Sequence, residues 1–473
     1  MSPAFNHAQP ALEFIPPCYS PWLRRAMQPL MPVWTVWQTN VAEIETRQVE
    51  ALATLYRDFK AGKTRFLIAF RHPSPTDPYV LSHVLWQDLP QTARAMGFDL
   101  GTTHTHFIYD RGIPLWAGSY LSWVFSHLGG VPIQRGKLDI LALKTARSLF
   151  VDGQFPLAAA PEGGNNGHNE IVSPLEPGMA QLAFWCAEDL QTQGRAESVV
   201  ILPVGIQYRY LAPPWERLSE LIAQLEADTG LGLPTKAERE SLPPLFESDH
   251  PPLSSNIASS SDPAELYGRL YRLAEHLLTL MEGYYREFYG VEFDASEGET
   301  EPNAQLAERL QNLMDKALRV AEDYFDLRPK GSIIDRCRRL EQAGWNRIFR
   351  ADANSLSPVA RGLADRVAEE ADLRMWHMRL MESFVAVTGH YVKDHPSADR
   401  FAETTLLLRD MVNRIKGKPI DRSPLGPQKA IVTVGQPIAV DQRLADYRSK
   451  RKRAIATLTQ DLQAEMAALI LTD

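Results

Sequence analysis

The hydrophobic pattern of the chain changes character several times, beginning with an amphipathic stretch. Apolar positions recur at helical spacing over residues 20–62, so we expect an N-terminal amphipathic helical segment over residues 1–63. Trp22, Trp34 and Trp37 belong to this segment. Tryptophans in such a helix either lie at a membrane interface or pack onto the domain that follows, and the pattern leaves both readings open.

Between residues 64 and 211 short apolar runs alternate with helical stretches. The runs that predict buried strands are 65–70, 106–109, 156–160 and 198–204. Helices are expected between them, for example over 138–152 and 175–190. Strands that alternate with helices predict an α/β domain over 64–211, with a largely parallel sheet flanked by helices.

Beyond residue 211 the pattern becomes helical. Residues 233–264 are rich in proline and serine, which is typical of an irregular linker. Long amphipathic patterns predict helices that begin at Asp262-Pro263 and continue over 303–325, 331–350, 357–392 and 397–416. We therefore expect residues 212–427 to form a linker and a large all-helical insertion.

The last stretch returns to strand character. Residues 430–438 are rich in β-branched side chains and bounded by Gly and Pro, and a helix is predicted over 441–469. Residues 428–473 are therefore expected to complete the α/β domain with a C-terminal strand and helix.

Composition narrows the class of protein. A length of 473 residues suggests roughly three structural units, and 44% hydrophobic residues are enough for a globular core. The formal net charge of -8 argues against nucleic acid as a partner. The cysteines, Cys18, Cys186 and Cys337, are too far apart to predict a disulfide framework or a zinc site, so no metal is expected.

Two features bear on the location of the protein. The N-terminus has no basic start followed by an apolar core, so we expect no signal peptide. Residues 112–134 are uncharged, but their glycines and prolines cluster towards both ends. This composition predicts a buried or interfacial segment rather than a membrane span.

The candidate chemistry centres on His72 and Asp77, which have a His-x4-Asp spacing. His83 and Asp88 share the spacing, which also arises by chance. Residues five apart in a regular helix are rotated by about 140°, so His83 and Asp88, within a predicted helix, are not expected to pair. The prolines between His72 and Asp77 disfavour helix and let the chain curl, just after a strand and at a helix start.

The residue types suit acyl transfer to a hydroxyl group. Histidine titrates near neutrality and can remove the proton of a hydroxyl, while a carboxylate on its other ring nitrogen fixes the tautomer. The acceptor would supply the attacking oxygen, so no serine nucleophile is needed. Ser74 lies between the pair but lacks the G-x-S-x-G context of a serine hydrolase.

Further segments of the chain match an ordered set of motifs in a known family. These are Gly130–Arg135, Pro161-Glu162-Gly163, Gly178–Ala183 and Ile201–Val204. With His72 and Asp77, they resemble the successive blocks of the glycerolipid acyltransferases, a family that includes the 1-acylglycerol-3-phosphate acyltransferases. The resemblance covers about residues 65–211, and Val434–Ile438 looks like a late strand of the family.

The resemblance implies membrane-associated transfer of a fatty acyl group from acyl-CoA or acyl carrier protein to a lysolipid, with no cofactor. It assigns Arg135, Glu162 and Gly163 to binding of the acceptor. One position departs from the family, because Asn165 stands where a second phosphate-binding arginine is usual. An acceptor with one negative charge or none is therefore expected, and Arg71 is a candidate to compensate.

Two other functions stay open at this point. The altered third block also suits a non-catalytic protein that binds a lipid or an acyl carrier through a degenerate site. A hydrolase, with water in place of the lipid hydroxyl, is the third reading. If the protein is an enzyme, we expect it to be cytoplasmic and peripherally bound to a membrane surface.

Overall fold

The computed structural model of the chain describes residues 7–134, 138–232, 243, 262–293, 301–384 and 389–472. The chain divides into two compact units. The sheet unit consists of Leu12–Arg209 and Pro427–Asp473, and the helical unit of Met1–Ala11 and Tyr210–Gly426.

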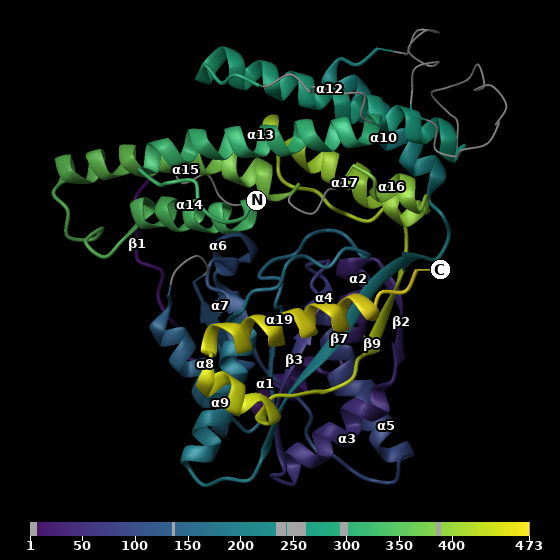
Figure 1. The fold of residues 1–473 in the computed structure, drawn as a ribbon, viewed down its shortest axis with the longest axis vertical. Coiled ribbons are helices and arrows are strands. Elements are labelled where there is room, and N and C mark those ends of the chain that lie inside the picture. The colour runs from purple at the N-terminus through teal and green to yellow at the C-terminus, as the bar shows by residue number, and fades with distance from the viewer. Residues whose placement is uncertain are drawn as a thin grey trace. The chain divides into compact units, whose positions relative to one another are not determined.

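The sheet unit is built on a mostly parallel sheet, which confirms the predicted α/β fold (Figure 1). Its strands are β2 (Val41–Arg47), β3 (Thr64–Phe70), β4 (His106–Asp110), β5 (Gly130–Ile133), β6 (Leu157–Ala159), β7 (Ser198–Tyr210), β9 (Gln428–Val434) and β10 (Ile438–Ala439). Their order is β2-β9-β7-β3-β6-β4-β5, and β10 pairs antiparallel with β7. The central β3 is parallel to both of its neighbours, β6 and β7.

Helices cover both faces of this sheet. One face carries α3 (Val49–Lys60), α4 (Asp77–His83), a π-helix (Val84–Asp88) and α5 (Leu89–Ala95). The other face carries α8 (Ile140–Asp152), α9 (Gly178–Thr192), α18 (Leu444–Ser449) and α19 (Arg451–Ala468). Side chains of β3 alternate between the two cores: Phe66 and Ile68 enter the first, and Leu67 and Ala69 the second. Every residue of β3 is buried, which explains the continuous apolar run over residues 66–70.

The prediction of one helical segment near the N-terminus is wrong in part. The helices there are α1 (Pro21–Met27), α2 (Met31–Thr39) and α3, but Val41–Arg47 between them forms strand β2. Asn40, with a left-handed φ of 58°, ends α2. β2 then pairs in parallel with β9, a strand from the far end of the sequence. That long-range partner stabilises a strand in a stretch whose apolar spacing also suits a helix.

The uncharged stretch 112–134 contains α6 (Ile113–Ala117), α7 (Tyr120–His127) and strand β5. Among the described residues no helix is both long and apolar enough to cross a membrane. The helix predicted over 441–469 is interrupted: a 3-10 turn (Asp441–Arg443) precedes α18, and Lys450, with φ -143° and ψ 74°, separates α18 from α19.

The helical unit confirms the long helices that the amphipathic pattern predicts. They are α12 (Pro263–Tyr289), α13 (Pro302–Phe325), α14 (Ile333–Ile348), α15 (Pro358–Glu382) and α17 (Ala398–Ile415). The described residues of this unit also form α10 (Trp215–Thr229), α16 (Tyr391–Asp394) and a short parallel pair, β1 (Gln9–Pro10) with β8 (Phe349–Arg350). Side-chain caps fix several helix starts, such as the capping box of Ser332 with Asp335. Most of the predicted linker 233–264 lies outside the described residues.

Candidate active site

The candidate histidine lies directly beyond the central strand of the sheet. The Arg71 N–H donates to the Val204 carbonyl at 2.9 Å and so prolongs the pairing of β3 with β7. His72 follows, and the proline-rich turn then leads to Asp77, the first residue of α4. The carboxyl end of a parallel strand is where ligands gather in open α/β sheets.

His72 and Asp77 contact each other. His72 Nδ1 lies 2.8 Å from Asp77 Oδ2, which also accepts a hydrogen bond from the Ser74 N–H at 3.1 Å. The Asp77 side chain is fully buried, whereas that of His72 is 23% exposed. An ionised carboxylate can only accept, so the proton of the imidazole lies on Nδ1 and Nε2 carries the lone pair. No described residue forms a hydrogen bond with His72 Nε2.

A tyrosine that sequence reasoning missed holds the other oxygen of Asp77. The hydroxyl of Tyr208 donates to Asp77 Oδ1 at 2.5 Å. Tyr208 lies on β7, four residues beyond Val204, where β7 extends past its partner β3. Burial, reinforced by the Asp77 carboxylate, raises the pKa of Tyr208 well above its usual value, so its hydroxyl stays protonated and remains a donor.

A signal for this residue was present in the sequence. Ile206, Tyr208 and Tyr210 alternate with Gly205, Gln207 and Arg209, so the strand predicted to end at Val204 in fact continues. Alternation places Tyr208 in the same core as Val204 and Ile206, on the face of the sheet that α4 covers.

Glu162, in the loop after β6, connects the third block to the histidine. Its Oε1 accepts a hydrogen bond from the backbone N–H of His72 at 3.0 Å. Its Oε2 accepts from the Ser173 N–H at 2.9 Å and from Asn166 Nδ2 at 3.2 Å. The next residue, Gly163, has φ 71°, a conformation that favours glycine. The buried carboxylate therefore fixes the backbone of His72 and the loop at the same time.

Arg71 is fully buried, and its guanidinium binds backbone. It donates to the carbonyls of Asn169 at 2.5 Å, His168 at 3.1 Å and Ile171 at 2.5 Å, and its Nε lies 3.7 Å from Glu162 Oε1. These contacts hold the loop after β6 against the end of β3. They also leave Arg71 engaged rather than open to a phosphate.

The remaining candidates are placed less closely or not at all. Asn165 is exposed in the loop that follows Glu162 and Gly163. Arg135, the predicted acceptor-binding arginine, lies outside the described residues. Within the part of the chain that is described, no group of three or more His, Cys, Asp or Glu side chains is arranged to hold a metal ion.

The second His-x4-Asp pair corrects one expectation. His83 Nε2 lies 3.3 Å from Asp88 Oδ1, although the two were not expected to pair. The reason is the π-helix Val84–Asp88, because its hydrogen bonds join residues five apart and bring such residues towards one face. The π-helix therefore pairs two side chains that a regular α-helix would separate.

Comparison with known proteins places the site in a family domain. Residues 43–207 match the family model described as Acyltransferase, a range that includes His72, Asp77 and Glu162. Searches of the curated proteins and of the solved structures gave no match to the chain. The match begins in β2 and ends in β7, so it spans the strands that position the candidate site. Residues 43–207 thus form a domain of the acyltransferase family.

Proposed function

We propose that this domain transfers a fatty acyl group from a thioester to a hydroxyl of a lysoglycerolipid, with His72 as general base. The observation that carries the proposal is the 2.8 Å contact between His72 Nδ1 and the buried carboxylate of Asp77. This contact fixes the tautomer in which Nε2 is the basic atom. The exposure of the His72 side chain gives an acceptor hydroxyl access to it.

The reaction balances without a metal or a covalent enzyme intermediate. His72 Nε2 removes the proton of the acceptor hydroxyl while the hydroxyl oxygen attacks the carbonyl carbon of the thioester. The tetrahedral intermediate then collapses, the C–S bond breaks, and the departing thiolate takes the proton from the imidazolium. Asp77 stays ionised throughout and stabilises the positive charge on His72. Tyr208 and the Ser74 N–H donate to that carboxylate and orient it.

The donor in this proposal is acyl-CoA or acyl carrier protein, and the acceptor is bound through Arg135 and the loop that carries Asn165. Arg71 donates to backbone carbonyls, so it does not replace the charge that an arginine at position 165 would supply. An acceptor with one negative charge or none therefore fits best.

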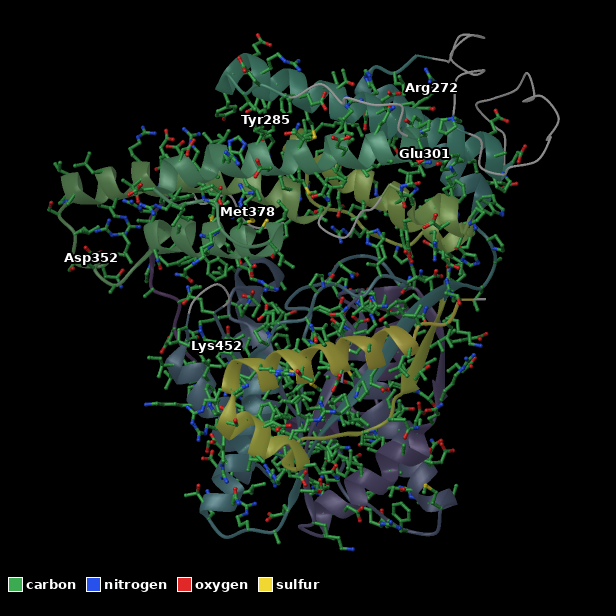
Figure 2. The ribbon with its side chains drawn as sticks, in the orientation of Figure 1. Arg272, Tyr285, Glu301, Asp352, Met378 and Lys452 are labelled. Atoms are coloured by element: carbon green, nitrogen blue, oxygen red, sulfur yellow. The ribbon has the colours of Figure 1, made fainter. Side chains whose placement is uncertain are left out.

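Peripheral attachment to a membrane is part of the proposal. Trp22, Trp34 and Trp37 are exposed, Trp37 to 74%. The ring of Trp22 lies 6.4 Å from that of Trp123, itself exposed on α7. Exposed tryptophans favour the interface between water and lipid. The basic residues 450–453 at the start of α19, marked by Lys452 in Figure 2, offer a further contact for anionic headgroups or an acidic carrier.

The direct test is turnover by a His72→Ala variant. Purified protein is incubated with acyl-CoA or acyl carrier protein and a panel of lysolipids, and the product is identified by mass spectrometry. We expect turnover to fall by roughly 10²–10⁴-fold, because a positioned general base contributes about that factor. His83→Ala is the matched control and should keep full activity. Undiminished transfer by His72→Ala would refute the mechanism.

A second candidate function is binding without turnover. The observation that favours it is Asn165, where the family usually has an arginine, together with the engagement of Arg71 by backbone. This reading predicts that the unaltered protein binds lysolipid or acyl carrier, forms no product, and binds equally well as His72→Ala. A hydrolase would instead release free fatty acid when no acceptor is present.

A further inference from the structure

The helical unit contains a groove of its own, which the acyltransferase mechanism does not use. Its volume is about 720 Å³. Its walls are one face of α12, one face of α15 and the end of α17 with the segment after it, and the end of α10 closes it. Tyr285 of α12, labelled in Figure 2, is one of the residues that line it. The volume lies within the range of roughly 300–1,000 Å³ that small-molecule sites occupy.

The walls of the groove are largely apolar and open to solvent. Leu280 of α12, Leu373 of α15 and Ile415 of α17 are 48%, 51% and 45% exposed, and all three line the groove. The rings of Tyr284 and Trp376 lie 6.1 Å apart and extend the apolar wall. Large apolar side chains gathered in a hollow mark a place where an apolar ligand gains by leaving water.

Of the four basic residues that line the groove, Arg414 and Lys418 form no salt bridge with a described residue. Arg379 pairs with Asp372 at 3.0 Å, and Lys416 with Asp228 at 2.6 Å, so both acidic residues of the lining are engaged. Among the described residues no group accepts a hydrogen bond from the guanidinium of Arg414.

Arg414 is joined to a wall of the groove through its backbone. Its backbone carbonyl accepts a hydrogen bond from Trp376 Nε1 at 3.3 Å, and its Nε is buried. Burial lowers the pKa of Arg414 to about 10, so it is charged at neutral pH. The nearby carboxylates of Glu382 and Asp410 oppose this lowering. Of the guanidinium nitrogens only Nε is both buried and without a hydrogen-bond acceptor, so the terminal nitrogens stay accessible to an anion in the groove.

We propose that this groove binds one medium-chain fatty acid, with the carboxylate on Arg414 and the hydrocarbon chain along Leu373, Trp376 and Leu280. Carboxylate is the planar anion that a guanidinium binds best through two parallel hydrogen bonds. An arginine without a salt bridge, beside the apolar wall of the groove, fits one carboxylate better than a phosphate, which carries more charge and more acceptors. All residues that line the groove belong to the helical unit, and the proposal does not rest on the acyltransferase reaction.

Equilibrium dialysis of the full chain against labelled dodecanoate, below its micellar concentration, tests the site. We expect saturable binding of one molecule per chain, and decanoate should bind about tenfold more weakly because it buries two fewer methylene groups. Leu373→Glu, on an exposed part of α15, should abolish binding without unfolding the protein. Leu363→Glu makes the same change outside the groove on the same helix and should bind as the unaltered protein does.

The role of the cation is tested by comparing dodecanoate with dodecanol. The unaltered chain should bind dodecanoate about tenfold more tightly than dodecanol, since a charge-assisted hydrogen bond is lost with the alcohol. Arg414→Gln should bind the two equally, while Arg366→Gln, an exposed arginine on α15, should keep the preference. His72→Ala should bind dodecanoate normally even where it abolishes acyl transfer.

Several outcomes would overturn the inference. Equal binding by Leu373→Glu and the unaltered chain would place the fatty acid elsewhere. Displacement of dodecanoate by inorganic phosphate alone would show an anion site without a lipid preference. Binding lost in His72→Ala but kept in Leu373→Glu would assign the fatty acid to the acyltransferase domain.

Discussion

The hydrogen bond from Tyr208 to Asp77 supports the sharpest prediction. Replacing Tyr208 by phenylalanine keeps the aromatic ring, which is packed in the core of the sheet unit, and removes only the hydroxyl. Asp77 would keep its contacts with His72 Nδ1 and the Ser74 N–H, but Oδ1 would lose the donor at 2.5 Å. Because Asp77 is fully buried, water cannot replace that donor freely.

The expected magnitude follows from the type of bond. A hydrogen bond to a charged group contributes about 1.5–3 kcal/mol, which corresponds to a factor of roughly 10–150 if the whole loss falls on the transition state. Asp77 retains its other donors, so we expect kcat to fall about tenfold. The KM for the acceptor should stay unchanged, because Tyr208 acts through Asp77 and not on the substrate.

The assay is steady-state acyl transfer alongside thermal unfolding, with Tyr447→Phe as the matched control. Tyr447 is also buried in the sheet unit, and its hydroxyl accepts a hydrogen bond from Gln181 Nε2 at 2.7 Å. Both variants should lose stability, by about 1–2 kcal/mol, but only Tyr208→Phe should lose kcat. If the two variants lose the same small fraction of kcat, Tyr208 is merely a structural residue and the reasoning is wrong.

Three further predictions follow from the same site and its domain. Glu162→Gln turns one buried oxygen into an N–H donor that faces two other donors, the N–H of Ser173 and the side-chain amide of Asn166. Both kcat and the midpoint of thermal unfolding should therefore fall. An unchanged midpoint would contradict the role of Glu162 in holding the loop. Asn165→Arg should raise the preference for a phosphate-bearing acceptor over a neutral one about tenfold, where the preference is the ratio of the two kcat/KM values measured with paired lysolipids. Burial lowers the pKa of His104 from 6.5 to about 3, so as pH falls below 6.5 the unfolded chain takes up a proton that the folded chain does not. The free energy of unfolding, measured by urea denaturation, should then fall by roughly 1.4 kcal/mol for each pH unit below 6.5 because of this residue. His104→Gln should flatten this pH dependence, whereas His83→Gln should not.

The sequence predicted the sheet well where burial imposes a simple pattern. Strand β3 and the core of β7 are covered on both faces, so their apolar runs are continuous and easy to recognise. Strand β2 was missed because it lies at the edge of the sheet and has mixed exposure. Its structure depends on β9, which is far away in the sequence, and local spacing carries no record of that partner.

The residues of the candidate site also differ in how well the sequence predicted them. His72 and Asp77 are close in sequence, and the prolines between them indicated the turn that joins them. Tyr208 contacts Asp77 across a separation of 131 residues, and only the register of β7 against β3 brings it there. Glu162 was expected to bind the acceptor, yet its described contacts include the backbone of His72 and the loop after β6. Such roles depend on loop closure, which residue types alone do not encode.

The two His-x4-Asp pairs show which property separates a candidate catalytic pair from a coincidence. Proximity alone does not, because the π-helix brings His83 Nε2 to 3.3 Å from Asp88 Oδ1, although the contact of His72 Nδ1 with Asp77 Oδ2 is shorter, at 2.8 Å. The difference lies in the carboxylate. Asp77 is fully buried and holds two donors besides the histidine, whereas the Asp88 side chain is 20% exposed and water can solvate it. A buried, oriented carboxylate stabilises an imidazolium far more than a solvated one does, because the surrounding dielectric is lower. His83→Ala should therefore leave turnover unchanged, although His83 and Asp88 have the same spacing and also lie close together.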